Sequence, residues 1–209
     1  MNICVIIPMK DPSEAKSRLE NRLPHAARAA LARTLFRNLL SVLGKIAAQP
    51  TILVVSSSPA IRAICSSADV ACIDDPSGDL NAAVTAGARH AADLGHRSVC
   101  VLPGDLADPS IADLDALFAL PRNFESVIVS PAHDGGTNAL IVTPPTGLAF
   151  AYGPQSSLEH QRRAEASGMA VIVAPLDSLL YDVDTQADLG ERLTRGLQRA
   201  FGEKTERRS

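Results

Sequence analysis

The chain has 209 residues, of which 46% are hydrophobic, and this is enough apolar material for one compact domain. Its formal net charge of −3 gives no overall electrostatic reason to bind nucleic acid or an anionic membrane. No apolar run approaches the roughly 20 residues that cross a bilayer, and the first residues lack the basic leader of a signal peptide. We therefore expect a cytoplasmic protein that has neither nucleic acid nor a membrane as its partner.

Short β-branched runs alternate with helical patterns along the chain, which predicts one α/β domain over residues 1–201 and a charged tail at 202–209. The sheet should be mostly parallel and doubly wound, with helices on both faces. Helices are expected from about Pro24, over 79–94 and from about Ser156. The closely spaced strands after Leu120 predict a subdomain folded over the sheet edge. The predicted strands are 2–8, 51–56, 70–73, 98–102, 126–130, 139–143 and 170–173.

Three cations, Lys10, Lys16 and Arg18, follow the first predicted strand. Ligands of open parallel sheets bind beyond the carboxyl ends of the strands, so this position suits the phosphates of a nucleotide. Lysine supplies a mobile point charge and arginine a planar fork, and both match polyphosphate oxygens. The alternative is a solvated basic loop that pairs with Glu14 and Glu20.

Acidic residues end two further strand-like segments. Asp105 follows a buried run through a Pro-Gly turn, and Asp182 and Asp184 stand two residues apart in LLYDVDT. On an extended segment both of the latter carboxylates would project from one face, where they could hold a metal. Magnesium prefers one or two carboxylates together with substrate phosphate oxygens. The alternatives are a turn-forming role for Asp105 and helix capping by Asp184.

Two glycine-rich turns, DGGTNAL and YGPQSS, carry hydroxyl groups and backbone N–H groups that could hold a second anion. Ser156 and Ser157 stand at the predicted start of a helix, where free amides and the helix dipole attract phosphate. The chain lacks Walker, Rossmann and GxSxG motifs, and its four cysteines and five histidines lack metal-binding spacing. The cysteines are expected to be reduced core residues, and the histidines surface or structural groups.

The order of these motifs resembles the guanylyltransferases of coenzyme F-420 biosynthesis, which act on 2-phospho-L-lactate, phosphoenolpyruvate or 3-phosphoglycerate. The resemblance covers nearly the whole chain. One departure is Ala107, where the family often has proline, and this is expected to loosen the PGDL turn. The segments that carry the resemblance are IPMKDPSEAKSRL, DLNAAV, LPGDL, DGGTNAL, YGPQSSLEHQRRA and YDVDTQADL.

The resemblance implies GMP transfer from GTP to the phosphate of a three-carbon phospho-acid, with Mg²⁺ as cofactor and a deazaflavin transferase downstream. The residues that it implies fall into three groups. Metal binding is assigned to Asp105, Asp182 and Asp184, the phospho-acid to Thr137, Gly153 and Ser156, and GTP to Lys10, Lys16, Arg18 and Asn81, with Lys16, Arg18 and Asp105 as catalytic residues.

Two other functions stay open at this level. One is a cytidylyl- or molybdopterin-type nucleotidyltransferase, which would share the fold and the metal but use another base and acceptor. The other is a noncatalytic nucleotide-binding module that regulates a partner. We also expect Val84, Ala88 and His133 to line the acid pocket, and Asn81 could equally cap its helix.

Overall fold

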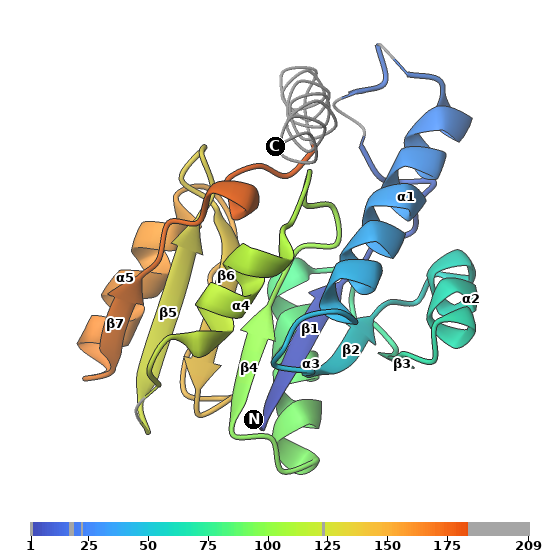
Figure 1. Ribbon diagram of the computed structural model, residues 1–209. Coiled ribbons are helices and arrows are strands. Elements are labelled where there is room, and N and C mark those ends of the chain that lie inside the picture. Colours follow the sequence, from blue (N-terminus) through green and yellow to red (C-terminus); the bar gives the residue numbers. More distant parts are fainter. Residues whose placement is uncertain (1, 17–18, 22, 123, 184–209) are drawn as a thin grey trace, which may run out of the picture.

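A computed structural model describes residues 2–16, 19–21, 23–122 and 124–183 (Figure 1). Its sheet has seven strands in the order β3-β2-β1-β4-β6-β5-β7. The strands are β1 (Ile3–Pro8), β2 (Thr51–Val55), β3 (Ala71–Ile73), β4 (Ser98–Val101), β5 (Ser126–Pro131), β6 (Thr137–Thr143) and β7 (Ala170–Val173). The helices are α1 (His25–Leu43), α2 (Pro59–Ser67), α3 (Leu80–Asp93), α4 (Ile111–Ala119) and α5 (Ser156–Ala166), and Asp177–Leu179 forms a 3-10 turn, η2.

Hydrophobic side chains cover both faces of the sheet, because successive residues of a strand point to opposite sides. In β1, Ile3, Val5 and Ile7 belong to the core beneath α1, α2 and α4. The intervening Cys4 and Ile6 belong to the core beneath α3 and α5. The result is the expected doubly wound arrangement, with helices on both faces of one sheet (Figure 1).

Local signals start several of these helices. Ser58 caps α2 ahead of Pro59, and Asp79 caps α3 by accepting a hydrogen bond of 2.9 Å from the Ala82 amide. Within α3, a Cβ added to Gly87 would lie 2.8 Å from Ile6 Cγ2, so glycine lets this helix pack closely on β1. The close contact at Gly87 sets the position of α3 against the middle of β1.

The strand directions decide which loops meet. β6 pairs antiparallel with β4 and β5, whereas every other pairing in the sheet is parallel. The beginning of β6 therefore lies at the same edge as the carboxyl ends of β1 and β4. The predicted strands and the three predicted helices are confirmed within a few residues, although α2 and α4 were not predicted.

The predicted subdomain over the sheet edge is wrong. β5, β6 and β7 continue the main sheet, and β6 pairs directly with β4 near the middle of that sheet. The predicted tail at 202–209 lies outside the described residues. No helix in the described part of the chain is long and apolar enough to cross a membrane.

Candidate active site

The loop after β1 carries the predicted phosphate-binding cations and turns back onto the sheet edge. Lys16 has a positive φ of 60°, and its side chain is only 3% exposed. Its Nζ donates to Asp105 Oδ2, just after β4, in a charge-assisted hydrogen bond. Two of the predicted catalytic residues thus form an ion pair, while Arg18 lies outside the described residues.

Asp11 attaches this loop to the start of α2. Its Oδ1 accepts hydrogen bonds from the Ser13 amide at 2.8 Å and the Ser13 hydroxyl at 2.5 Å. Its Oδ2 accepts from the Ser58 hydroxyl at 2.5 Å. These bonds, led by the one from the Ser13 hydroxyl, lower the pKa of Asp11. The charged carboxylate therefore holds the lysine-bearing loop beside the end of β2.

Asp105 and Asp182 come from two backbone segments that run side by side. Leu106 and Asp182 form an antiparallel bridge, and the Val183 amide donates to the Asp105 carbonyl at 3.1 Å. The Ala107 amide donates to the Tyr181 carbonyl at 2.9 Å. Proline has no N–H and cannot make this bond, so the departure at Ala107 adds a link to the turn instead of only loosening it.

Asp105 and Asp182 are of the ligand type that suits a hard cation such as Mg²⁺, which takes one or two carboxylates and completes its shell with phosphate oxygens and water. Asp105 retains 28% exposure of its side chain, and Asp182 is half-buried. No cluster of three possible metal-binding side chains occurs among the described residues. The third predicted ligand, Asp184, lies outside them, so the predicted three-aspartate site stays a prediction.

The two glycine-rich turns meet at the start of β6. Thr137 Oγ1 lies 3.0 Å from Ser156 Oγ at the first residue of α5, and both side chains are buried. Gly153, with a φ of 152°, stands just before that helix. The three residues predicted to hold the phospho-acid are therefore brought to one place by β6, α5 and the loop between them.

The backbone amides of the first two residues of α5 were predicted to be free, but both make hydrogen bonds within the protein. The Ser156 amide donates to the Gly153 carbonyl and the Ser157 amide donates to the Gly135 carbonyl, both at 3.2 Å. The predicted free amides are thus used within the protein.

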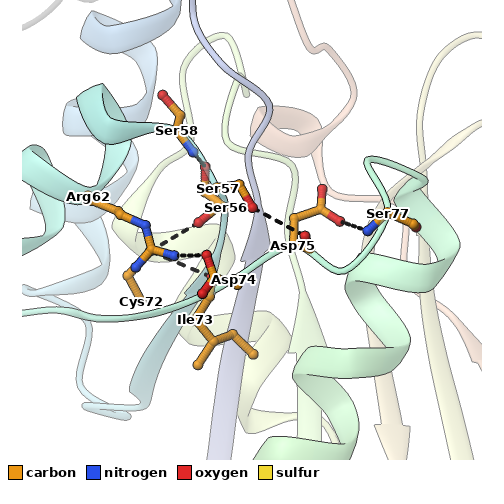
Figure 2. Close-up of polar contacts among 9 residues, drawn as sticks. All are labelled: Ser56, Ser57, Ser58, Arg62, Cys72, Ile73, Asp74, Asp75 and Ser77. Atoms are coloured by element: carbon orange, nitrogen blue, oxygen red, sulfur yellow. Dashed lines mark hydrogen bonds and ion pairs between the residues drawn. The ribbon is translucent and has the colours of Figure 1, made fainter.

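A separate groove of about 280 Å³ opens between the loop after β1 and the ends of β2 and β3. Lys10, Ser57 and Asp75 are among its lining residues. Figure 2 shows the wall of this groove, where the Ser57 hydroxyl donates to the Asp75 carbonyl at 3.2 Å and Asp75 Oδ1 accepts from the Ser77 amide at 3.1 Å. Behind it, Arg62 pairs with Asp74.

The other predicted nucleotide-binding residue, Asn81, faces a different hollow of about 640 Å³. The side-chain amide of Asn81 makes two hydrogen bonds with the backbone of Tyr152. Its Nδ2 donates to the Tyr152 carbonyl at 3.1 Å, and its Oδ1 accepts from the Tyr152 amide at 2.7 Å. Val84 and Ala88, expected near the acid pocket, are core residues beneath the sheet. His133 stacks on Tyr181 with ring centroids 4.6 Å apart.

Comparison with known protein families shows to which family the chain belongs. Residues 3–203 match the model of the family described as "Guanylyl transferase CofC like". The chain belongs to the CofC-like guanylyltransferase family. A relative from Colwellia psychrerythraea, named 3-phospho-D-glycerate guanylyltransferase, is 36% identical, and the match covers 90% of each chain. A phosphoenolpyruvate guanylyltransferase from Conexibacter woesei is also 36% identical, over 90% of this chain and 86% of its own.

Solved structures agree with this placement at the level of the fold. A nucleotide-diphospho-sugar transferase from Desulfovibrio desulfuricans superimposes with a TM-score of 0.71 at 17% identity, covering 90% of this chain and 84% of its own. A 4-diphosphocytidyl-2C-methyl-D-erythritol synthase superimposes with a TM-score of 0.63 at 13% identity, covering 92% and 99%. The fold of this CofC-like chain is thus that of the nucleotidyltransferases.

Sequence reasoning gave no site role to His160, which shapes the CofC-like site. His160 is fully buried, and its ring nitrogens contact Thr137 Oγ1 at 3.1 Å and the Ala151 amide at 3.0 Å. For Asn81, the sequence predicted nucleotide binding or helix capping but not the two hydrogen bonds to the Tyr152 backbone. The four-residue spacing of Ser156 and His160 places both on one face of α5, and this was the available signal.

Proposed function

We propose that this protein transfers GMP from GTP to the phosphate of a three-carbon phospho-acid, with release of pyrophosphate, in the biosynthesis of coenzyme F-420. The observation that carries the proposal is the family match over residues 3–203. Relatives named for 3-phospho-D-glycerate and for phosphoenolpyruvate supply the candidate acceptors. A cytidylyl- or molybdopterin-type transferase and a noncatalytic module have no comparable support.

The order of groups along the sheet edge supports a two-substrate reaction. The groove lined by Lys10 opens at the ends of β2 and β3, the pair of Lys16 and Asp105 stands between β1 and β4, and the hydroxyls of Thr137 and Ser156 lie at the start of β6. In this proposal the nucleoside occupies the groove and the phospho-acid approaches the hydroxyls. The α-phosphate then lies near the lysine.

The reaction requires the protein to position the two substrates and to stabilise the negative charge of their phosphates. An acceptor phosphate oxygen attacks the α-phosphorus of GTP, the bond from that phosphorus to the bridging oxygen breaks, and pyrophosphate leaves with the electron pair. The acceptor is already ionised near neutral pH, since the second ionisation of a phosphomonoester is near pH 6. Lys16 would stabilise the charge on the phosphates, and the two hydroxyls would orient the acceptor.

Magnesium would neutralise phosphate charge at this edge when bound, and Asp105, Asp182 and Asp184 are the residues that would hold it. The bridge between Leu106 and Asp182 brings the backbone segments of Asp105 and Asp182 together, and carboxylates are the ligands that Mg²⁺ prefers. The guanylylated product is expected to pass to a deazaflavin transferase in the cytoplasm. Neither nucleic acid nor a membrane enters this proposal.

The test is a pyrophosphate-release assay with purified protein, GTP and Mg²⁺. Phosphoenolpyruvate, 3-phospho-D-glycerate and 2-phospho-L-lactate are offered separately, and the deazaflavin transferase is added to capture the unstable product. We expect turnover with GTP and at least one acid, and much less with CTP. Preference for CTP, or nucleotide binding without pyrophosphate release under all three conditions, would contradict the proposal.

A further inference from the structure

His160 forms a buried chain of hydrogen bonds with the two hydroxyls at the start of β6 and α5. Its Nε2 lies 3.0 Å from the Ala151 amide, and its Nδ1 lies 3.1 Å from Thr137 Oγ1. Thr137 Oγ1 in turn lies 3.0 Å from Ser156 Oγ. The imidazole is 0% exposed, so water does not compete for either nitrogen.

The Ala151 contact determines which ring nitrogen of His160 carries the proton. A backbone amide is always a donor, so Nε2 must accept and must be unprotonated. Nδ1 then carries the hydrogen of the neutral ring and donates to Thr137 Oγ1. The ring is neutral in the folded protein, because burial and, to a smaller extent, the neighbouring Arg163 lower its pKa to about 4, against a weaker opposite effect of Glu159.

This tautomer changes what the two hydroxyls can offer to an anion. The imidazole N–H, the Thr137 O–H and the Ser156 O–H supply three hydrogens for the two contacts between these groups, so one hydroxyl hydrogen is left over. With the other tautomer, the two hydroxyl hydrogens would both be used internally. An anion would then face only lone pairs, which repel it.

We infer that His160 is a positioning residue for the phospho-acid: it donates to Thr137 and thereby leaves one hydroxyl hydrogen of the Thr137–Ser156 pair for the acceptor anion. This inference rests on the proposed function. The same ring also holds the loop ahead of α5, since the Ala151 amide binds its Nε2 and the Tyr152 ring packs edge-on at 4.9 Å. Asn81 holds that loop from α3.

Two near-isosteric substitutions of His160 separate the roles of its two ring nitrogens. In His160→Asn the amide nitrogen can replace Nδ1 and donate to Thr137, whereas in His160→Gln the amide oxygen can replace Nε2 and accept from Ala151. We expect His160→Gln to raise the KM for the phospho-acid about tenfold or more, because the hydroxyl pair loses its donor. His160→Asn should stay within about threefold of the wild type. The KM for GTP should change little in both.

A second comparison tests whether His160 acts through Thr137. Thr137→Val removes the hydroxyl and keeps the shape, so adding His160→Gln to it should raise the phospho-acid KM no further. His90→Asn, in the last turn of α3, is the matched control for replacing a histidine. Circular dichroism and thermal unfolding of each variant show whether it is folded, and any that is not is excluded from the kinetic comparison.

The outcomes separate this inference from the proposed function. If wild-type protein shows no turnover of GTP with phosphoenolpyruvate, 3-phospho-D-glycerate or 2-phospho-L-lactate, the proposed function fails. If the wild type is active but His160→Gln matches His160→Asn, or if the effects of Thr137→Val and His160→Gln multiply, the positioning role is refuted. A rise confined to the GTP KM would refute it as well.

Discussion

Protonation of His160 should destabilise the folded protein as the pH falls. The pKa of this group drops from 6.5 to about 4 on folding, mainly because the ring is buried. Below pH 6.5 the unfolded chain binds a proton that the folded protein does not accept, so the free energy of unfolding decreases. The stabilisation is complete above about pH 7 and is lost progressively between pH 6.5 and pH 4.

The size of this effect follows from the two pKa values. Linkage gives a loss of about 0.8 kcal/mol at pH 6 and about 2 kcal/mol at pH 5, relative to pH 8, from His160 alone. The structural cause is specific: a protonated Nε2 could no longer accept from the Ala151 amide, and the charge would be buried.

Urea denaturation of the wild type and of His160→Asn at pH 8, pH 6 and pH 5 measures the effect. Asparagine does not titrate, so the other ionisable groups cancel between the two proteins and only the difference in pH dependence matters. The wild type should lose about 2 kcal/mol more than the variant between pH 8 and pH 5. Equal losses in both proteins would refute the reasoning, and a smaller loss in the wild type would show that the sign is wrong.

Three further predictions concern the reaction. Asp105→Asn and Asp182→Asn should each abolish Mg²⁺-dependent pyrophosphate release, since an amide keeps the shape of the carboxylate but not its charge. Circular dichroism should show that both variants stay folded. Full activity in either variant would contradict the metal assignment. Lys16→Ala should mainly raise the KM for GTP and Ser156→Ala that for the phospho-acid, because each removes a contact to a different anion; initial rates with one substrate varied at a time will show whether the effects separate. No protein nucleophile is required, so labelled GTP alone should leave no GMP–enzyme adduct on a denaturing gel. For the same reason, Cys100→Ser should keep most of the activity. An isolated adduct or ping-pong kinetics would overturn the prediction of direct transfer.

The strands and the chemistry of the loops between them could be read from the amino-acid sequence. β-Branched runs and the turns that end them are local patterns, and each was found within a few residues. The cations after β1 and Asp105 after β4 were assigned to one edge because parallel strands end together. The ion pair of Lys16 with Asp105 confirms that these two residues meet, although the roles assigned to them in catalysis stay predictions.

The contacts that organise the site depended on long-range pairing, which leaves no local pattern. β6 has the same continuous run of apolar residues whether it runs parallel or antiparallel, and only its pairing with β4 and β5 brings Thr137 to the active edge. The bridge that joins the segments of Asp105 and Asp182 is equally nonlocal. His160 lies in a segment that carries the family resemblance, but sequence reasoning assigned it no role. Its role follows from being buried between the Ala151 amide and the Thr137 hydroxyl, where each nitrogen has one partner, and the tertiary structure alone creates that environment.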